Sequence, residues 1–187
     1  MGLPRTVNEG TAAMIHKSNQ AHLSLNWILL AGFAGGLAEV LWVSLYAALS
    51  PLQGWDVARE IAASVLGASI GASLAPAVGL LIHFALSAVV ALAFVTLLQA
   101  PPMRRLRPAG VVVGAMAMLA AIWAMNFVVL LPVLNPAFVA LLPLSVSFAS
   151  KMLFGLGLGV TLNRAAASRR RGGGNCSTGS PSEPALR

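Results

Sequence analysis

The sequence predicts an all-α integral membrane protein with four transmembrane helices in a bundle and a short interfacial amphipathic helix between the first two spans. Of its 187 residues, 58% are apolar and only 9% are charged, whereas soluble domains carry roughly 25% charged residues. The charge-free runs 61–103 and 108–150 are each about twice the ~20 residues that one spanning helix needs. Composition and run length therefore exclude an ordinary soluble globular protein.

Charges and prolines delimit the first two spans. The first span is predicted at 25–49, an apolar stretch whose one charged residue is Glu39. The second is predicted at 77–99, because glycine and proline within 71–76 interrupt the charge-free run. Two further prolines, at 101–102, end it.

A turn divides the second charge-free run into two spans. Pro132, Asn135 and Pro136 fall close together, and prolines stop a helix while asparagine favours a turn. The third span is therefore predicted at 110–131 and the fourth at 137–162.

The connection between the first two spans has helical periodicity at 55–66. Val57, Ile61 and Val65 share one face, and the opposite face carries Asp56, Arg59, Glu60 and Ala63. This pattern predicts a short helix on the outer membrane surface, with Trp55 at the level of the lipid headgroups. A gate over the bundle or a docking element for a partner is the alternative.

Basic residues alternate from one connection to the next. A polar N-terminal segment (1–24) and a basic tail (164–187) flank the membrane domain (25–163), and together with the loop after the second span they hold most of the 12 Lys and Arg residues. This positive-inside pattern predicts that both termini are cytoplasmic. The Ala/Gly/Arg-rich composition suggests a bacterial cell inner membrane. The tail has no apolar face, so we expect it to be disordered.

Several other classes of protein and site are not expected. The net charge of +7 is assigned to topology and contact with anionic lipid in the bilayer rather than to nucleic-acid binding. The first apolar stretch is too long for a cleaved signal peptide. A single cysteine excludes a disulfide framework, and the absence of catalytic motifs predicts that the protein is not an enzyme and holds no cofactor.

Four polar residues within the spans are the candidate functional cluster: Glu39, His83, Asn126 and Lys151. The helical rise places Glu39 about 15 Å from the outer end of its span and Lys151 about 21 Å along a longer, tilted one. Each charge near the midplane costs about 2.5–3.5 kcal/mol alone, so we expect the two to form an ion pair. His83 is placed where it could reach Asn126.

Small residues accompany the two charges on their helix faces. Gly32 and Gly36 share a face with Glu39, and Gly155 and Gly159 share one with Lys151. Small residues at this spacing let helix backbones approach closely. We therefore expect these glycines to pack the first span against the fourth.

The segment around Glu39, Ala31-Gly-Phe-Ala-Gly-Gly-Leu-Ala-Glu-Val40, resembles the first span of the small multidrug resistance exporters. That resemblance covers about ten residues, and it implies a four-span transporter in which the Ala-Glu-Val glutamate binds a cationic drug or a proton. The rest of the chain departs from that family in its long first connection, its basic tail and Lys151, which would neutralise the exporter's carboxylate.

Two functions from different classes remain open. In the first, the Glu39–Lys151 pair is structural and the protein is a scaffold, an accessory subunit of a membrane complex or a homo-oligomer. In the second, the polar cluster serves a proton-linked small-solute transporter or channel component, since intramembrane ionisable groups are often functional. A metal site is not expected, because the depths of Glu39, His83 and Asn126 differ by about 6 Å.

Overall fold

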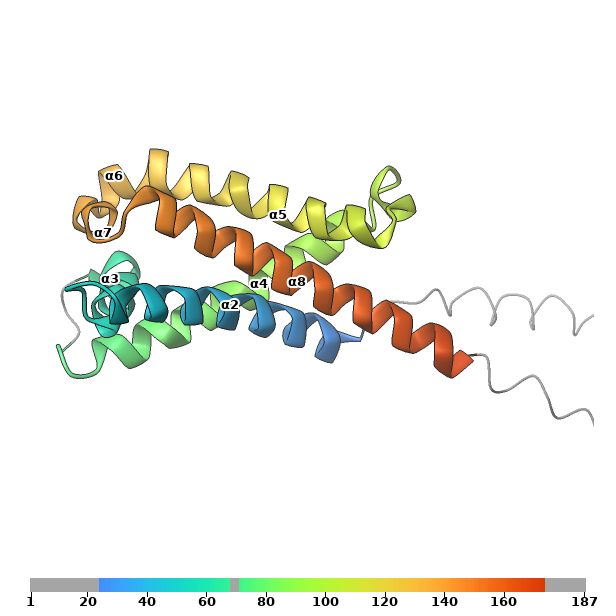
Figure 1. The fold of residues 1–187 in the computed structure, drawn as a ribbon, viewed down its shortest axis with the longest axis horizontal. Coiled ribbons are helices and arrows are strands. Elements are labelled where there is room, and N and C mark those ends of the chain that lie inside the picture. Colours follow the sequence, from blue (N-terminus) through green and yellow to red (C-terminus); the bar gives the residue numbers. More distant parts are fainter. Residues whose placement is uncertain (1–23, 68–70, 174–187) are drawn as a thin grey trace, which may run out of the picture.

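The computed structural model describes residues 24–67 and 71–173, and the regular elements within them are all helices (Figure 1). Four helical segments are long and apolar enough to cross a membrane. They confirm the predicted all-helical fold with four candidate spans, and they indicate a multi-pass membrane protein. The segments are α2 (Leu25–Ala48), α4 (Ala75–Leu98), the composite third span (Pro108–Leu134) and α8 (Leu144–Gly173).

The first two spans begin and end close to the predicted positions. Ser24 precedes α2, which continues to Ala48. Pro76 lies in the first turn of α4, where its missing N–H removes no intrahelical hydrogen bond. Beyond α4, the short 3₁₀ helix η2 (Met103–Arg105) leads into the third span.

The third span changes its helical form in the middle. It consists of α5 (Pro108–Ala124), a π-helical turn η3 (Met125–Leu130) and the short α6 (Leu131–Leu134). In a regular α-helix, the ring of Pro132 would clash with the carbonyl of residue 128. The wider π turn just before Pro132 accommodates the ring while the span continues.

The fourth span starts later than predicted and ends later. Pro136–Leu141 forms a separate short helix, α7, and α8 begins at Leu144 rather than at residue 137. The cause is Pro143, because a residue before proline is disfavoured in the α region and Leu142 is extended. At the other end, α8 continues through 164–173, so this part of the predicted disordered tail is helical.

Two predicted segments extend past the described residues. Of the polar N-terminal segment (1–24), only Ser24 is described. The predicted disorder of 174–187 also lies outside the described residues.

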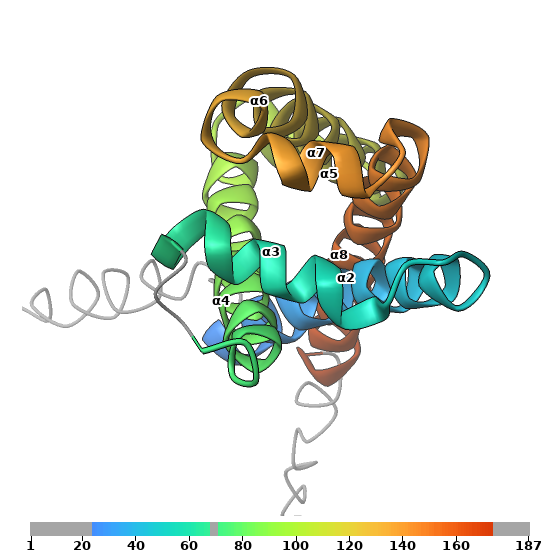
Figure 2. The ribbon, with the colours of Figure 1, turned by 90° about the vertical axis from the view of Figure 1, so that its left-hand side faces the viewer.

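The helix predicted between the first two spans is present as α3 (Gly54–Leu66). A reciprocal cap starts it: the Gln53 N–H donates to Asp56 Oδ2 at 3.2 Å, and the Gln53 side chain accepts from the Asp56 backbone. Its acidic first turn also suits the helix dipole. Figure 2 shows α3 and α7 lying across one end of the four long helices.

The long helices pack in sequence around the molecule. α2 packs against α8 and α4, and α5 packs against α8. α4 and α5 are in contact near Phe94, whose ring lies 3.7 Å from the position of a Cβ built on Gly114. From there they diverge toward the end covered by α3 and α7 (Figures 1 and 2). The main apolar core includes Phe94, Leu119 and Leu158.

The predicted glycines lie at helix interfaces, but not at the predicted one. Gly32 and Gly36 face Ser87 of α4, while Gly155 and Gly159 face α5. The spacing of small residues marks a close-packing face without naming the helix that covers it. The interface between α2 and α8 instead uses other glycines, Gly35 and Gly157.

Candidate functional site

Glu39 of α2 and Lys151 of α8 form an ion pair through Glu39 Oε1. Because α8 begins at Leu144, Lys151 lies about 10 Å from the start of its helix, and Glu39 lies about 14 Å from the end of α2. The late start of α8 therefore brings Lys151 to the level of Glu39. Glu39 is only 8% exposed, so most of its contact with solvent or lipid is replaced by protein.

The two oxygens of the Glu39 carboxylate have different surroundings. Oε1 accepts from Lys151 and, at 3.3 Å, from the Ser150 hydroxyl. Oε2 is buried, and no donor from the described residues reaches it. An unsatisfied buried acceptor is unfavourable, so Oε2 would gain from a donor that another molecule supplied.

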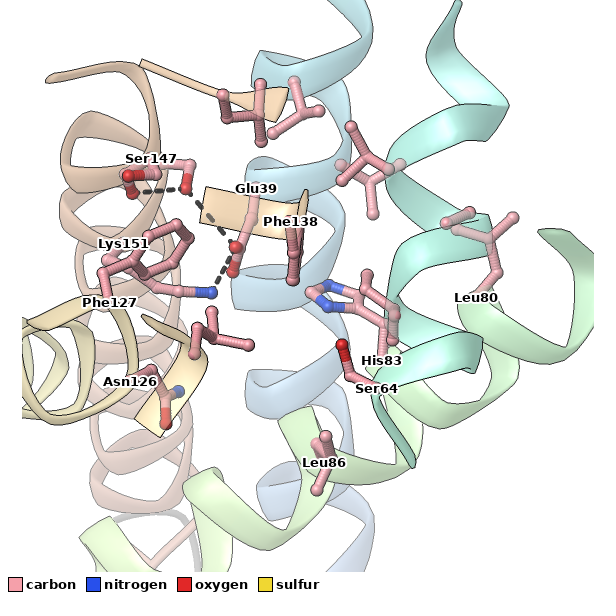
Figure 3. Close-up of a pocket in the computed structure, with 18 of the residues that line it drawn as sticks. Glu39, Ser64, Leu80, His83, Leu86, Asn126, Phe127, Phe138, Ser147 and Lys151 are labelled. Atoms are coloured by element: carbon pink, nitrogen blue, oxygen red, sulfur yellow. Dashed lines mark hydrogen bonds and ion pairs between the residues drawn. The ribbon is translucent and has the colours of Figure 1, made fainter. Parts of the chain in front are cut away.

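His83 and Asn126 do not form the predicted contact. The His83 Nε2–H donates to the carbonyl of Gly36 at 3.2 Å, and the Ser87 hydroxyl donates to the His83 carbonyl at 2.7 Å. Gly36 allows this approach because it has no side chain between α2 and α4. Asn126 projects from the π turn η3 on the other side of the site (Figure 3).

All four predicted polar residues line one cavity of about 270 Å³. Figure 3 shows Glu39, Lys151, His83 and Asn126 around it. Most of the remaining lining is valine, leucine, isoleucine and phenylalanine from α2, α3, α4, η3 and α7. A mainly apolar cavity with a few convergent polar groups is typical of a site for a small molecule.

Asn135 joins the two short helices that cover this cavity. Its Nδ2 group donates to Glu60 Oε2 at 2.9 Å and to the Ser64 hydroxyl at 3.0 Å, both on α3. Its Oδ1 accepts from the Phe138 N–H at 3.2 Å and caps α7. Glu60 therefore faces the turn before α7, whereas the sequence placed it on the outer face of α3.

We expect Asn135→Asp to loosen α3 without uncapping α7. Aspartate is a good N-cap, but it cannot donate to Glu60 and adds a second negative charge beside it. A hydrogen bond to a charged group contributes about 1.5–3 kcal/mol, so amide hydrogen exchange within α3 should accelerate about tenfold or more. Thr96→Val, which removes an exposed hydroxyl far from α3, is the control. Unchanged protection of α3 in Asn135→Asp would contradict this role.

Two tryptophans hold the start of α8 beside the ion pair. Trp42 Nε1 donates to the Val146 carbonyl at 3.1 Å, and Trp123 Nε1 donates to the Ser147 hydroxyl at 3.0 Å. The sequence pattern assigned no role to either tryptophan, and it placed Asn135 in a turn without indicating its contacts with Glu60 and Ser64. The available signal was that a tryptophan within a span needs a partner for its N–H.

The site combines one ion pair with a mainly apolar lining. Within 24–67 and 71–173, no group of three or more His, Cys, Asp or Glu residues comes together to hold a metal ion. The ion pair offers an acceptor and ammonium donors inside an apolar space.

No family model matches the chain, and no curated protein or solved structure matches it either.

Proposed function

We propose that this multi-pass membrane protein binds a small solute in the cavity beside Glu39 and Lys151, as a component of a transporter or channel. The observation that carries the proposal is the cavity itself. Protein interiors are close-packed, and a pair that only fixed the register of two helices would need no such space beside it. The cavity favours the solute-binding function over a purely structural pair.

The distribution of charge supports an orientation for the protein. Arg105, Arg107 and Arg164 lie at the end of the molecule where α2 begins (Figure 1), and the positive-inside rule assigns this end to the cytoplasm. The chain would then enter α2 and leave α8 on the cytoplasmic side of a bacterial inner membrane. In this orientation α3 lies at the outer interface, where Trp55, 55% exposed, would reach the headgroups.

The exposure of the third span supports a second function. Only 11% of its most apolar window is buried, against 33% in each of the other three. Such a surface suits contact with lipid or with another subunit. It favours the accessory role, as a subunit of a membrane complex or as a homo-oligomer, and a homo-oligomer is compatible with solute binding.

Purification in mild detergent followed by native mass spectrometry tests the proposal. We expect the chain alone or as a homo-oligomer, with a small molecule bound. The exchanged pair, Glu39→Lys with Lys151→Glu, should restore the protein level that each single change lowers, but it should lose the bound molecule because the positions of donor and acceptor are reversed. A defined complex with other proteins and an empty cavity would instead support the accessory role.

A further inference from the structure

The geometry points to a class of solute: a neutral amphiphile, with a hydroxyl or amide head and a short apolar tail, that enters the cavity sideways from the lipid. This inference rests on the proposed solute-binding function and adds the chemistry of the ligand and its route. Three features of the cavity carry it: the position of its mouth, the packing at its two ends and the charge of its polar wall.

The mouth of the cavity lies between α4 and the η3–α6 part of the third span. Leu86 on one side and Leu130 on the other both line the cavity, yet they are 53% and 43% exposed. Val65 and Leu134, which also line it, are 57% and 69% exposed, so the mouth extends along the third span toward α3. Leu86 lies about 16 Å along α4, near the middle of a hydrocarbon core about 30 Å thick. Leu130 lies about 6 Å before the end of the third span at Leu134, so the mouth runs from the middle of this core toward its edge. A solute that passes it meets lipid chains and must be soluble in lipid.

Helices α3 and α7 cover part of one end of the cavity, and the packed core closes the other. At one end, α3 and α7 are joined through Asn135, and Val57 and Leu142 pack with Val43 beneath them. At the other end, Phe94 and Leu119 belong to a closely packed core. A route from water along the helix axes would require these contacts to open, whereas the lateral mouth is already present.

The polar wall selects a neutral head. The charges of Glu39 and Lys151 compensate each other, so a charged ligand would bring a third, uncompensated charge into the membrane, which is costly. Glu39 Oε2 has no donor among the described residues, and the Lys151 ammonium has three N–H donors, of which the carboxylate takes one. A hydroxyl or a primary amide can donate to the carboxylate and accept from the ammonium at the same time, once a rotation of the Glu39 side chain brings Oε2 to the cavity surface.

The size of the cavity limits the tail. Its volume of about 270 Å³ lies just below the range of about 300–1,000 Å³ that is usual for ligand pockets. The apolar lining can therefore hold a short or medium chain, while a complete phospholipid is too large.

Photolabelling in lipid nanodiscs tests this inference on the full chain. The probe is a medium-chain alcohol that carries an alkyl diazirine, and the labelled residues are mapped by mass spectrometry. We expect labels on Phe127, which lines the cavity and is only 7% exposed. An excess of the plain alcohol or of the primary amide should reduce this labelling about tenfold, while the alkane, alkylammonium and carboxylate of equal chain length should leave it nearly unchanged.

Two variants on one helix separate entry through the mouth from general partitioning into lipid. Leu86→Trp narrows the mouth and should reduce labelling of Phe127. Leu81→Trp is the matched control, because Leu81 is 71% exposed and lies outside the cavity lining, and it should leave the labelling unchanged.

The outcomes that would overturn the inference are distinct from those that would overturn solute binding. Stronger competition by a charged amphiphile, or equal labelling in both tryptophan variants, would contradict the ligand class or its route and leave a solute-binding cavity in place. Labelling confined to lipid-facing residues, together with an empty cavity in native mass spectrometry, would contradict both.

Discussion

Replacing Lys151 by methionine is expected to destabilise the protein by about 3–5 kcal/mol, the usual effect of removing one partner from a buried ion pair. Methionine keeps the length of the side chain but leaves the Glu39 carboxylate without its cation. Glu39 has few alternatives, because it is 8% exposed and, among the described residues, only the Ser150 hydroxyl also donates to it. The loss should be measured as the free energy of unfolding in lipid, and as a lower protein level in membranes.

The double variant Lys151→Met with Glu39→Gln is the control for this prediction. It removes both charges, and replacing a complete buried pair is often neutral or stabilising. We therefore expect the double variant to recover most of the lost stability. If Lys151→Met alone costs less than about 1 kcal/mol, the typical value of an exposed pair, the two groups are not buried together. If the double variant is as unstable as the single one, the charge is not the cause.

Gly79→Ala is expected to displace α3 from α4. A Cβ built on Gly79 would overlap the carbonyl oxygen of Ala58, which is backbone and cannot rotate away. Overpacking of this kind typically costs 1–3 kcal/mol. This cost equals or exceeds the ~1 kcal/mol by which alanine is favoured over glycine within a helix. The cover of the cavity should loosen, and amide exchange in α3 should rise toward that of an undocked helix.

Gly114→Ala is the matched control for the substitution at Gly79. Both glycines lie within long apolar helices, but a Cβ at Gly114 would be in ordinary contact with Phe94 at 3.7 Å. In thermal unfolding, Gly79→Ala should therefore be less stable than the wild type, and Gly114→Ala should be equally stable or more stable. Hydrogen exchange of α3 should rise only in Gly79→Ala. Wild-type protection of α3 in Gly79→Ala would show that α3 does not pack on α4 as described.

Patterns along the chain predicted the parts of the fold that depend on solvation. Long charge-free runs require lipid, so the number of candidate spans followed from length and from prolines such as Pro76 and Pro132. The ion pair between Glu39 and Lys151 was predicted from the free-energy cost of two separate charges in hydrocarbon. Both arguments depend on the free energy of transfer between water and lipid. This free energy is large enough that the details of packing change neither the number of spans nor the pairing of the charges.

Contacts that depend on packing direction were not predictable in the same way. The turn at Pro132–Pro136 suffices to divide the charge-free run, so the pattern gives no sign that Pro143 delays the fourth span, and it predicts Lys151 farther along its helix than the structure places it. Gly36 and His83 each have a face that periodicity identifies, but which helix covers it depends on the three-dimensional arrangement. The bond from Asn135 to Glu60 joins segments far apart in sequence, and no local pattern marks it.

The most direct test of the central claim is cross-linking between positions 39 and 151 in native membranes. Cysteines at Glu39 and Lys151, with Cys176 replaced by serine, should be joined within one chain by a short, membrane-permeant, bifunctional thiol reagent. The control pair uses Glu39 with Leu156, which is 43% exposed on α8. We predict efficient cross-linking of the first pair and little of the second. The opposite order would show that the two charged residues do not share one wall within the membrane.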